Sequence, residues 1–162
     1  GLMLKLIMHF QGCLRVPLIV KAPGRPGGRT SSLASSIDLP HTLLDLCGVA
    51  EYQGMQGTSL VPVIDDLGAG VRGAVLIEDD WPMAEVGSPF PIRTRTTVTS
   101  THRYTRDSDG FEMLYDLEHD PDELTNLATD GRDPAARVAA LDAMFDLMLR
   151  ADDLTRTEPV SP

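Results

Sequence analysis

The stretch Glu112-Met-Leu-Tyr-Asp-Leu117 has the composition of a β-strand, and the fold of this chain can be worked out from it. The residues before it, Asp107-Ser-Asp-Gly110, are typical of a tight turn. Two earlier stretches, Thr96–Tyr104 and Ala74–Ile77, are also rich in β-branched or other apolar residues. Because the connections are short, the sequence predicts that these three strands pair as a small antiparallel meander.

A helix is predicted after this sheet, from Pro134 to Arg150. Its apolar residues recur at helical spacing on one face, which we expect to cover the sheet: Val138, Leu141, Phe145 and Met148. The tail from Asp152 to Pro162 is predicted to be frayed.

The part of the chain before the sheet has a different pattern. Val16-Pro-Leu-Ile-Val20 is apolar throughout, as expected of a strand covered on both faces. A short helix is predicted between Asp38 as its N-cap and Gly48 as its C′ residue, with leucines at helical spacing, namely Leu39, Leu43 and Leu46. Aspartates and glycines from 65 to 70 then break the pattern, so we place a boundary there and predict two parts, residues 1–70 and 71–162.

Composition and charge exclude several classes of protein. With 162 residues, the chain is long enough to bury a core without disulfide or metal support. Its formal net charge of -10 is the wrong sign for binding a nucleic acid or an anionic membrane surface. The apolar runs are far shorter than the ~20 residues of a membrane span. Cys13 and Cys47 form no ligand cluster and favour a reducing compartment, so our expectation for localisation, otherwise unknown, leans to the cytoplasm.

Four motifs in a fixed order point to a family. The first is the succession of Gly1-Leu-Met-Leu-Lys5, Met8-His-Phe-Gln-Gly12 and Arg15-Val-Pro-Leu-Ile-Val20. The second is the helix with Asp38 at its start, and the third is the turn Gln56-Gly-Thr-Ser-Leu60. The last motif is Leu114-Tyr-Asp-Leu-Glu-His-Asp-Pro-Asp-Glu-Leu-Thr-Asn-Leu127. In this order they resemble the sulfatases of the alkaline-phosphatase-like superfamily. The resemblance implies an α/β fold, of which this chain holds the C-terminal part: one or two elements of the main sheet (residues 1–70) and an antiparallel subdomain with a terminal helix (residues 71–162).

The same resemblance implies a site that this chain holds only in part. Sulfatases carry a C-x-P-x-R or S-x-P-x-R motif, whose first residue becomes formylglycine, and Asp/Asn ligands for a divalent cation such as calcium, magnesium or manganese. Neither group occurs here, and Cys13-Leu-Arg-Val-Pro17 has the right residue types in the wrong order. We therefore expect the C-terminal third of a sulfatase, broken off after the metal-binding segment and inactive alone.

Two residues are candidates for the site. Lys5 matches the family lysine that the resemblance implies contacts the sulfate and the nucleophile, although Leu6 stands where relatives often have glycine. An ammonium group is a compact cation suited to that contact. His9 could donate a proton to a leaving group, because its ordinary pKa is ~6.5, but a packed imidazole is the more common role for such a residue.

Other polar residues have structural interpretations. Arg15 is expected to form a structural ion pair, and Asp38 to cap a helix rather than act as an acid. His102 and Arg103 could reach a substrate cleft, but strand residues of this kind usually face solvent. The acidic residues of the last motif are predicted to form a capped, solvated turn: Asp116, Asp120, Asp122 and Glu123.

The sequence thus predicts part of a metal-dependent sulfuric-ester hydrolase that acts on a small sulfate ester, binds neither nucleic acid nor membrane, and could form a homo-oligomer. Two alternatives stay open. The parent protein could hydrolyse phosphonate monoesters or phosphodiesters, because similar sites stabilise similar anions. The chain could also be a non-catalytic lobe for oligomerisation or substrate binding.

Overall fold

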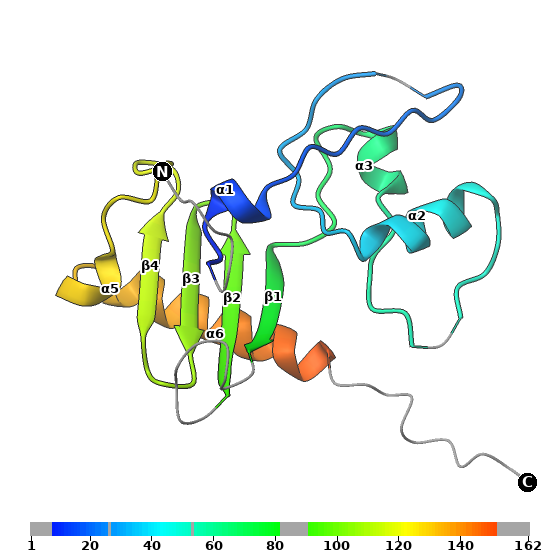
Figure 1. Ribbon diagram of the computed structural model, residues 1–162. Helices are drawn as coiled ribbons and strands as arrows, with labels where there is room; N and C mark the ends of the chain where they lie inside the picture. Colours follow the sequence, from blue (N-terminus) through cyan, green and yellow to red (C-terminus); the bar gives the residue numbers. More distant parts are fainter. Residues whose placement is uncertain (1–7, 26, 53, 82–90, 152–162) are drawn as a thin grey trace, which may run out of the picture. The chain divides into compact units, whose positions relative to one another are not determined.

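The computed structural model of the chain describes residues 8–25, 27–52, 54–81 and 91–151, and they belong to two compact units. One unit comprises residues 1–18 and 76–147 of the chain, and the other comprises residues 19–75 and 148–162. Figure 1 shows the elements of both.

The first unit is built on a four-stranded sheet with the strand order β1-β2-β3-β4. The strands are β1 (Ala74–Trp81), β2 (Ile92–Thr99), β3 (His102–Asp107) and β4 (Glu112–Asp116). β3 pairs antiparallel with both β2 and β4, which confirms the predicted meander.

The predicted single strand from Thr96 to Tyr104 is wrong in one respect, because it is a hairpin. The chain turns at Ser100 and Thr101, where the hydroxyl of Thr99 accepts a hydrogen bond of 2.9 Å from the His102 N–H. β-branched residues continue through the turn, so composition alone does not show it.

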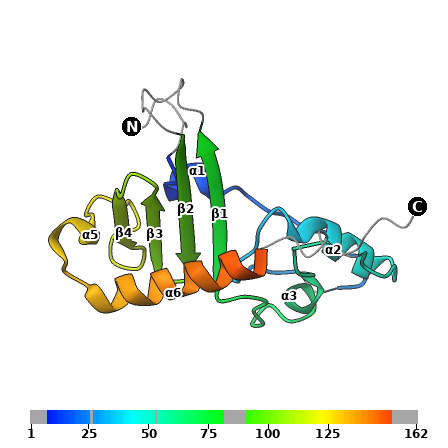
Figure 2. The same ribbon diagram turned by 90° about the horizontal axis from the view of Figure 1, so that it is seen from below.

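Helix α6 (Pro134–Ala151) covers one face of this sheet (Figure 2). The core between them contains Tyr104, Leu114, Ala140 and Met144, with Leu141 packed against it. The helix is confirmed, but its predicted apolar face is largely wrong, since Val138 is 54% exposed and Phe145 62% exposed. Small residues at positions 136 and 140 form the buried stripe instead, because alanines allow a helix to approach a sheet closely.

Helix α1 (Gln11–Leu14) lies over the opposite face of the sheet from α6 (Figures 1 and 2). Successive residues of a strand point to opposite faces, so Arg103 and Tyr115 face this side while Tyr104 and Leu114 face α6. The ring of Tyr115 packs against Phe10, with their centroids 5.8 Å apart. Residues far apart in the sequence thus share one layer.

The second unit contains the helices α2 (Asp38–Leu46) and α3 (Val61–Asp65). Asp38 is completely buried, but it is the first residue of α2 rather than its N-cap, which is Ile37. Its carboxylate accepts hydrogen bonds from Ser35 N–H (2.7 Å) and Thr58 N–H (2.9 Å), and it pairs with Arg72. The prediction of a cap is therefore wrong in position, although Asp38 is structural, as expected.

The turn Gln56–Leu60 lies directly against α2. A Cβ atom on Gly57 would lie 2.1 Å from the carbonyl oxygen of Ile37, so only glycine fits there. The Leu60 N–H donates to the hydroxyl of Thr42 at 2.9 Å. The buried side of α2 is therefore polar, whereas Leu43 is 62% exposed.

The stretch Val16–Val20 is not a strand, which corrects the prediction for that segment. Val16 is 72% exposed and Ile19 is 91% exposed. A strand needs a hydrogen-bonded neighbour, and within the part of the chain that the structure describes no strand pairs with these residues.

Four further expectations concern the whole chain. Cys13 and Cys47 are free thiols. Among the residues that the structure describes, no helix is long and apolar enough to cross a membrane. The domain boundary at residue 70 stays a prediction, as does the frayed tail, which falls in residues 152–162, outside the described ranges.

Candidate functional site

Of the two residues that the sequence singles out, the structure describes one. Lys5 lies outside the described residues. His9 is described and, through its contact with Thr96, lies on the face of the sheet opposite α6, so the candidate site is built from His9 and its neighbours.

His9 is 4% exposed and held from two sides. Its Nδ1 lies 2.8 Å from the hydroxyl of Thr96, and its Nε2 lies 3.6 Å from a carboxylate oxygen of Asp79. Burial lowers the pKa of the imidazole; Asp79 opposes this shift, and the positive charge of Arg103 adds to it. His9 is therefore a packed imidazole that favours its neutral form.

A chain of hydrogen bonds leads from His9 across the sheet. The Thr96 hydroxyl lies 2.6 Å from that of Thr105, its register partner on β3. Arg103 donates from one terminal nitrogen to the Thr105 hydroxyl at 2.7 Å. Each of these side chains is buried, so the hydrogen-bonded network forms a polar core on this face.

Arg103 is the centre of this polar core and has no exposed surface. Its Nε donates to a carboxylate oxygen of Glu123. The guanidinium carbon lies 4.8 Å from the ring centroid of Phe10 and 4.7 Å from that of Tyr115. Cation–π contacts of this kind and the ion pair together compensate for the burial of the charge. The expectation that Arg103 faces solvent is wrong.

Glu123, from the last sequence motif, completes this polar core. It is 7% exposed, and its second carboxylate oxygen accepts a hydrogen bond of 2.6 Å from the backbone N–H of Gln11. Its φ of 55° is left-handed, an unusual value for glutamate. The prediction of a solvated turn is therefore wrong for Glu123.

Asp116 and Asp120 accept hydrogen bonds from turn N–H groups, as predicted. Asp120 accepts hydrogen bonds from the N–H groups of Leu124 (3.0 Å) and Thr125 (2.8 Å). Asp116 pairs with the exposed His119, and this contact raises the pKa of His119 and lowers that of Asp116. Asn126 is the N-cap of helix α5 (Leu127–Asp130) and accepts from the Ala128 N–H. The motif is thus mainly structural.

The sequence offered a weak signal for Arg103 and Glu123. Arg103 lies in a stretch predicted as a strand and Glu123 in one predicted as a turn, but their pairing joins residues 20 positions apart. Sequence spacing does not show such a contact.

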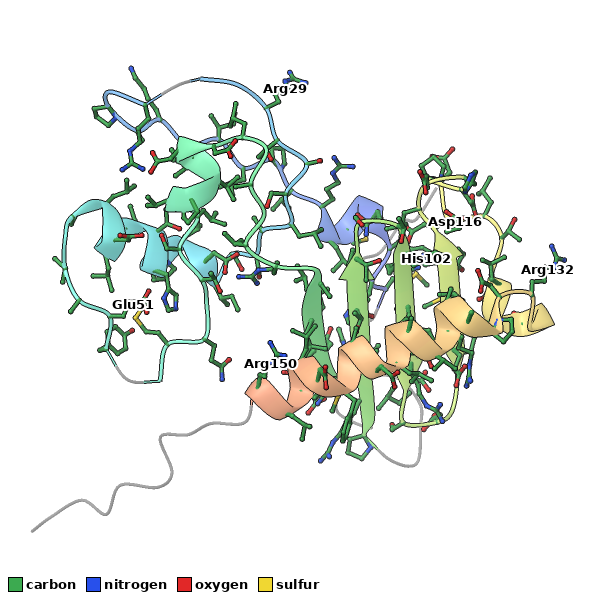
Figure 3. The ribbon with its side chains drawn as sticks, turned by 180° about the vertical axis from the view of Figure 1, so that it is seen from behind. Arg29, Glu51, His102, Asp116, Arg132 and Arg150 are labelled. Carbon is green, nitrogen blue, oxygen red and sulfur yellow. The ribbon has the colours of Figure 1, made fainter. Side chains whose placement is uncertain are left out.

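Two other candidates contribute little to this core. Arg15 is exposed, and the ion pair expected for it stays a prediction. His102 is partly exposed at the end of β3, beside its register partner Asp116 (Figure 3).

A shallow depression of about 320 Å³ lies next to Asp79. It is lined by Glu78, Asp79, Asp80 and Arg95. Arg95 forms ion pairs with Glu78 (2.8 Å) and Asp80 (2.7 Å), and the second contact lowers the pKa of Asp80. The arginine occupies the oxygens that a cation would need, and the described residues contain no cluster of three potential ligands. They do not fit the divalent cation of a sulfatase.

Comparison with known proteins identifies a matching family model and several similar sulfatases. A family model described as N-sulphoglucosamine sulphohydrolase, C-terminal, matches residues 1–146. Arylsulfatase K of Xenopus laevis is 32% identical over 125 residues, which make up 74% of this chain and 23% of the relative. A choline-sulfatase of Rhizobium meliloti (strain 1021) is 34% identical over 141 residues, 85% of this chain and 26% of the relative. The chain spans about a quarter of the length of these relatives.

Solved structures agree with this similarity. A 2-O GAG sulfatase is 26% identical with a TM-score of 0.59, over 76% of this chain and 26% of the other. The phosphonate monoester hydrolase of Agrobacterium radiobacter is 25% identical with a TM-score of 0.65, over 80% and 28%. Both have sequence similarity and share the fold.

Proposed function

The chain belongs to the N-sulphoglucosamine sulphohydrolase C-terminal family of sulfatases, and we propose from this membership that its protein hydrolyses a small sulfate ester. The observation that carries the proposal is the match over residues 1–146, together with 32–34% identity to an arylsulfatase and a choline-sulfatase. The chain spans about a quarter of these relatives, so the activity and the ester are proposals for the whole protein.

Lys5 is the residue of this chain that we propose for contact with the reacting group. Hydrolysis of a sulfate ester spreads negative charge over the sulfuryl oxygens and the leaving oxygen. A lysine ammonium near these oxygens lowers the energy of that state, because it is a compact cation with three donors. The assignment rests on the motif Gly1–Lys5.

His9 is proposed to support the site rather than to transfer a proton. Its two ring nitrogens face Thr96 and Asp79, and burial lowers its pKa. A proton donor must reach the leaving group, whereas this imidazole is 4% exposed. Its position four residues after Lys5 makes it part of the same segment.

The proposed reaction also includes a divalent cation, as expected for a sulfatase. The described residues do not fit such an ion, so no step is assigned to it.

Hydrolysis of phosphonate monoesters is the second candidate. The similarity to the phosphonate monoester hydrolase favours it, because that structure has a TM-score of 0.65 over 80% of this chain. Sulfate and phosphonate esters both develop charge on oxygens around a tetrahedral centre, so the same lysine would serve either reaction.

Turnover of matched substrates by the full-length protein tests the proposal. An aryl sulfate and an aryl phosphonate monoester with the same leaving group are compared, with and without a chelator. We expect a higher kcat/KM for the sulfate and loss of turnover after chelation. Lys5→Ala is expected to lower kcat by about 10²–10³-fold, the typical loss when one donor to a developing oxyanion is removed.

Lys21→Ala is the matched control, because Lys21 is the other lysine of the chain and is exposed. Its activity should stay within about twofold of wild type, as expected for a solvent-exposed side chain. A preference for the phosphonate ester would support the second candidate. A protein that turns over neither ester would support the non-catalytic lobe.

A further inference from the structure

Three successive residues of the N-terminal segment are each held by a different buried group. The His9 ring lies on Thr96, the Phe10 ring lies against the guanidinium of Arg103, and the Gln11 N–H donates to Glu123. Contacts to three consecutive residues fix both the position and the direction of a chain segment. The segment His9–Gln11 is therefore fastened to the sheet at the start of α1.

The carboxylate of Glu123 contacts both the backbone of this segment and a side chain of the sheet. One carboxylate oxygen accepts from Gln11 N–H at 2.6 Å, and the other accepts from Nε of Arg103. The sequence separation between Gln11 and Glu123 is 112 residues. A single carboxylate thus ties the start of α1, the strand β3 and the last motif together.

The backbone at Glu123 shows that this arrangement has an energetic cost. Among the residues that the structure describes, Glu123 is the one non-glycine residue with a positive φ. Such a conformation persists where surrounding contacts stabilise it, and it is often found where a side chain must be aimed. The two hydrogen bonds to its carboxylate are contacts of that kind.

We propose that Glu123 is a positioning residue of the sulfatase reaction put forward above, and that it acts by fixing the segment His9–Gln11. The inference rests on that proposed function, because the segment begins four residues after Lys5 in the sequence. A carboxylate is required at position 123, because the same group accepts a hydrogen bond from the Gln11 N–H and balances the positive charge of the buried Arg103. Glutamine would leave the charge of Arg103 unpaired.

Glu123→Gln in the full-length, metal-loaded protein tests this inference. We expect kcat for the aryl sulfate to fall by about 10–100-fold while KM changes by less than about threefold, because small misplacements of a reacting group lower the rate of the chemical step. Hydrogen–deuterium exchange should become at least about tenfold faster in a peptide covering residues 9–14, as expected when local opening becomes easier. Glu123→Asp keeps the charge, and aspartate tolerates the left-handed backbone, so its loss of kcat should be smaller.

Glu112→Gln is the matched control. Glu112 is also a largely buried carboxylate, with ion pairs to Arg137 (2.6 Å) and Arg106 (2.6 Å), but it lies on the α6 side of the sheet. Its loss should lower the melting temperature while kcat and exchange in residues 9–14 stay within about twofold of wild type, because it does not touch the segment.

Three results would overturn the inference: an unchanged kcat in Glu123→Gln, unchanged exchange in residues 9–14, or an equal loss of kcat in Glu112→Gln. If Glu123→Gln does not fold, Glu123→Asp is the second variant. Its side chain is one methylene shorter, so kcat should still fall and exchange in residues 9–14 should still become faster, each by less than expected for Glu123→Gln. Wild-type values of both would overturn the inference. A wild-type protein without sulfatase activity would instead refute the proposed function and, with it, the catalytic part of this inference. The exchange measurement would then still decide whether Glu123 fixes the segment.

Discussion

Arg103 shows what one residue can organise on this sheet. Its guanidinium has no exposed surface, yet it contacts Glu123, Thr105 and two aromatic rings. A buried arginine is tolerated when its charge is paired, because the ion pair compensates for desolvation. Nε and one terminal nitrogen of Arg103 donate hydrogen bonds, whereas the other terminal nitrogen has no partner among the described residues. The polar core around it fixes which side chains approach His9.

The pH dependence of stability should reveal the burial of His9. Its pKa is lowered in the folded protein from an ordinary value of 6.5. As the pH falls below that value, the unfolded chain takes up a proton that folded His9 resists, so the free energy of unfolding decreases. The loss begins below pH 6.5 and ends once the pH is below the folded pKa. His9→Gln should remove this contribution, which melting temperatures of both proteins between pH 8 and 5 would measure.

His119 provides a control of opposite sign. Asp116 raises its pKa in the folded protein, so its contribution to stability is present below pH 6.5 and is lost as the pH rises through the folded pKa. His119→Gln should therefore change the upper part of the same profile. An identical pH profile for wild type and His9→Gln would contradict the buried, neutral imidazole.

Among the elements, α6 shows why periodicity is not enough to choose a face. Val138 and Phe145 lie seven residues apart and are exposed, while Ala140 and Met144 lie four residues apart and are buried. Both patterns fit an amphipathic helix. The sheet selects the second face, because alanine lets Met144 reach the core around Tyr104.

Truncation of two neighbouring side chains on α6 separates these faces. Met144→Ala should lower the free energy of unfolding by about 2–5 kcal/mol, since it creates a cavity between helix and sheet. Phe145→Ala should cost less than about 1 kcal/mol, because Phe145 is 62% exposed and loses few contacts. Urea unfolding of the full-length variants measures both values. A larger loss for Phe145→Ala would mean that α6 presents its other face to the sheet.

At the scale of the whole molecule, the chain forms two compact units and spans about a quarter of the length of its sulfatase relatives. The chain covers 23% of arylsulfatase K and 26% of the choline-sulfatase. Its sequence contains neither C-x-P-x-R nor S-x-P-x-R, and its described residues contain no metal-binding cluster. The residues that we propose for the reaction in this chain are Lys5 and the segment around His9.

The isolated 162-residue chain should therefore not hydrolyse an aryl sulfate. The test compares turnover by this chain and by the full-length protein, with circular dichroism to show that the chain is folded. We expect at least about 10⁶-fold less turnover by the chain alone, comparable to the loss when a nucleophile is removed from a hydrolase. Metal-dependent turnover by the isolated chain would contradict this.

The sequence by itself determined the family, the antiparallel sheet, the short helix after Asp38 and the helix after Pro134, because each depends on local composition, spacing or ordered motifs. Tertiary structure decided the buried contacts. It placed His9 against Thr96, put Arg103 inside rather than outside, and paired it with Glu123. It also left Val16–Val20 unpaired. The physical reason is common to these cases: the free energy of a buried charge or an unpaired strand depends on partners distant in sequence.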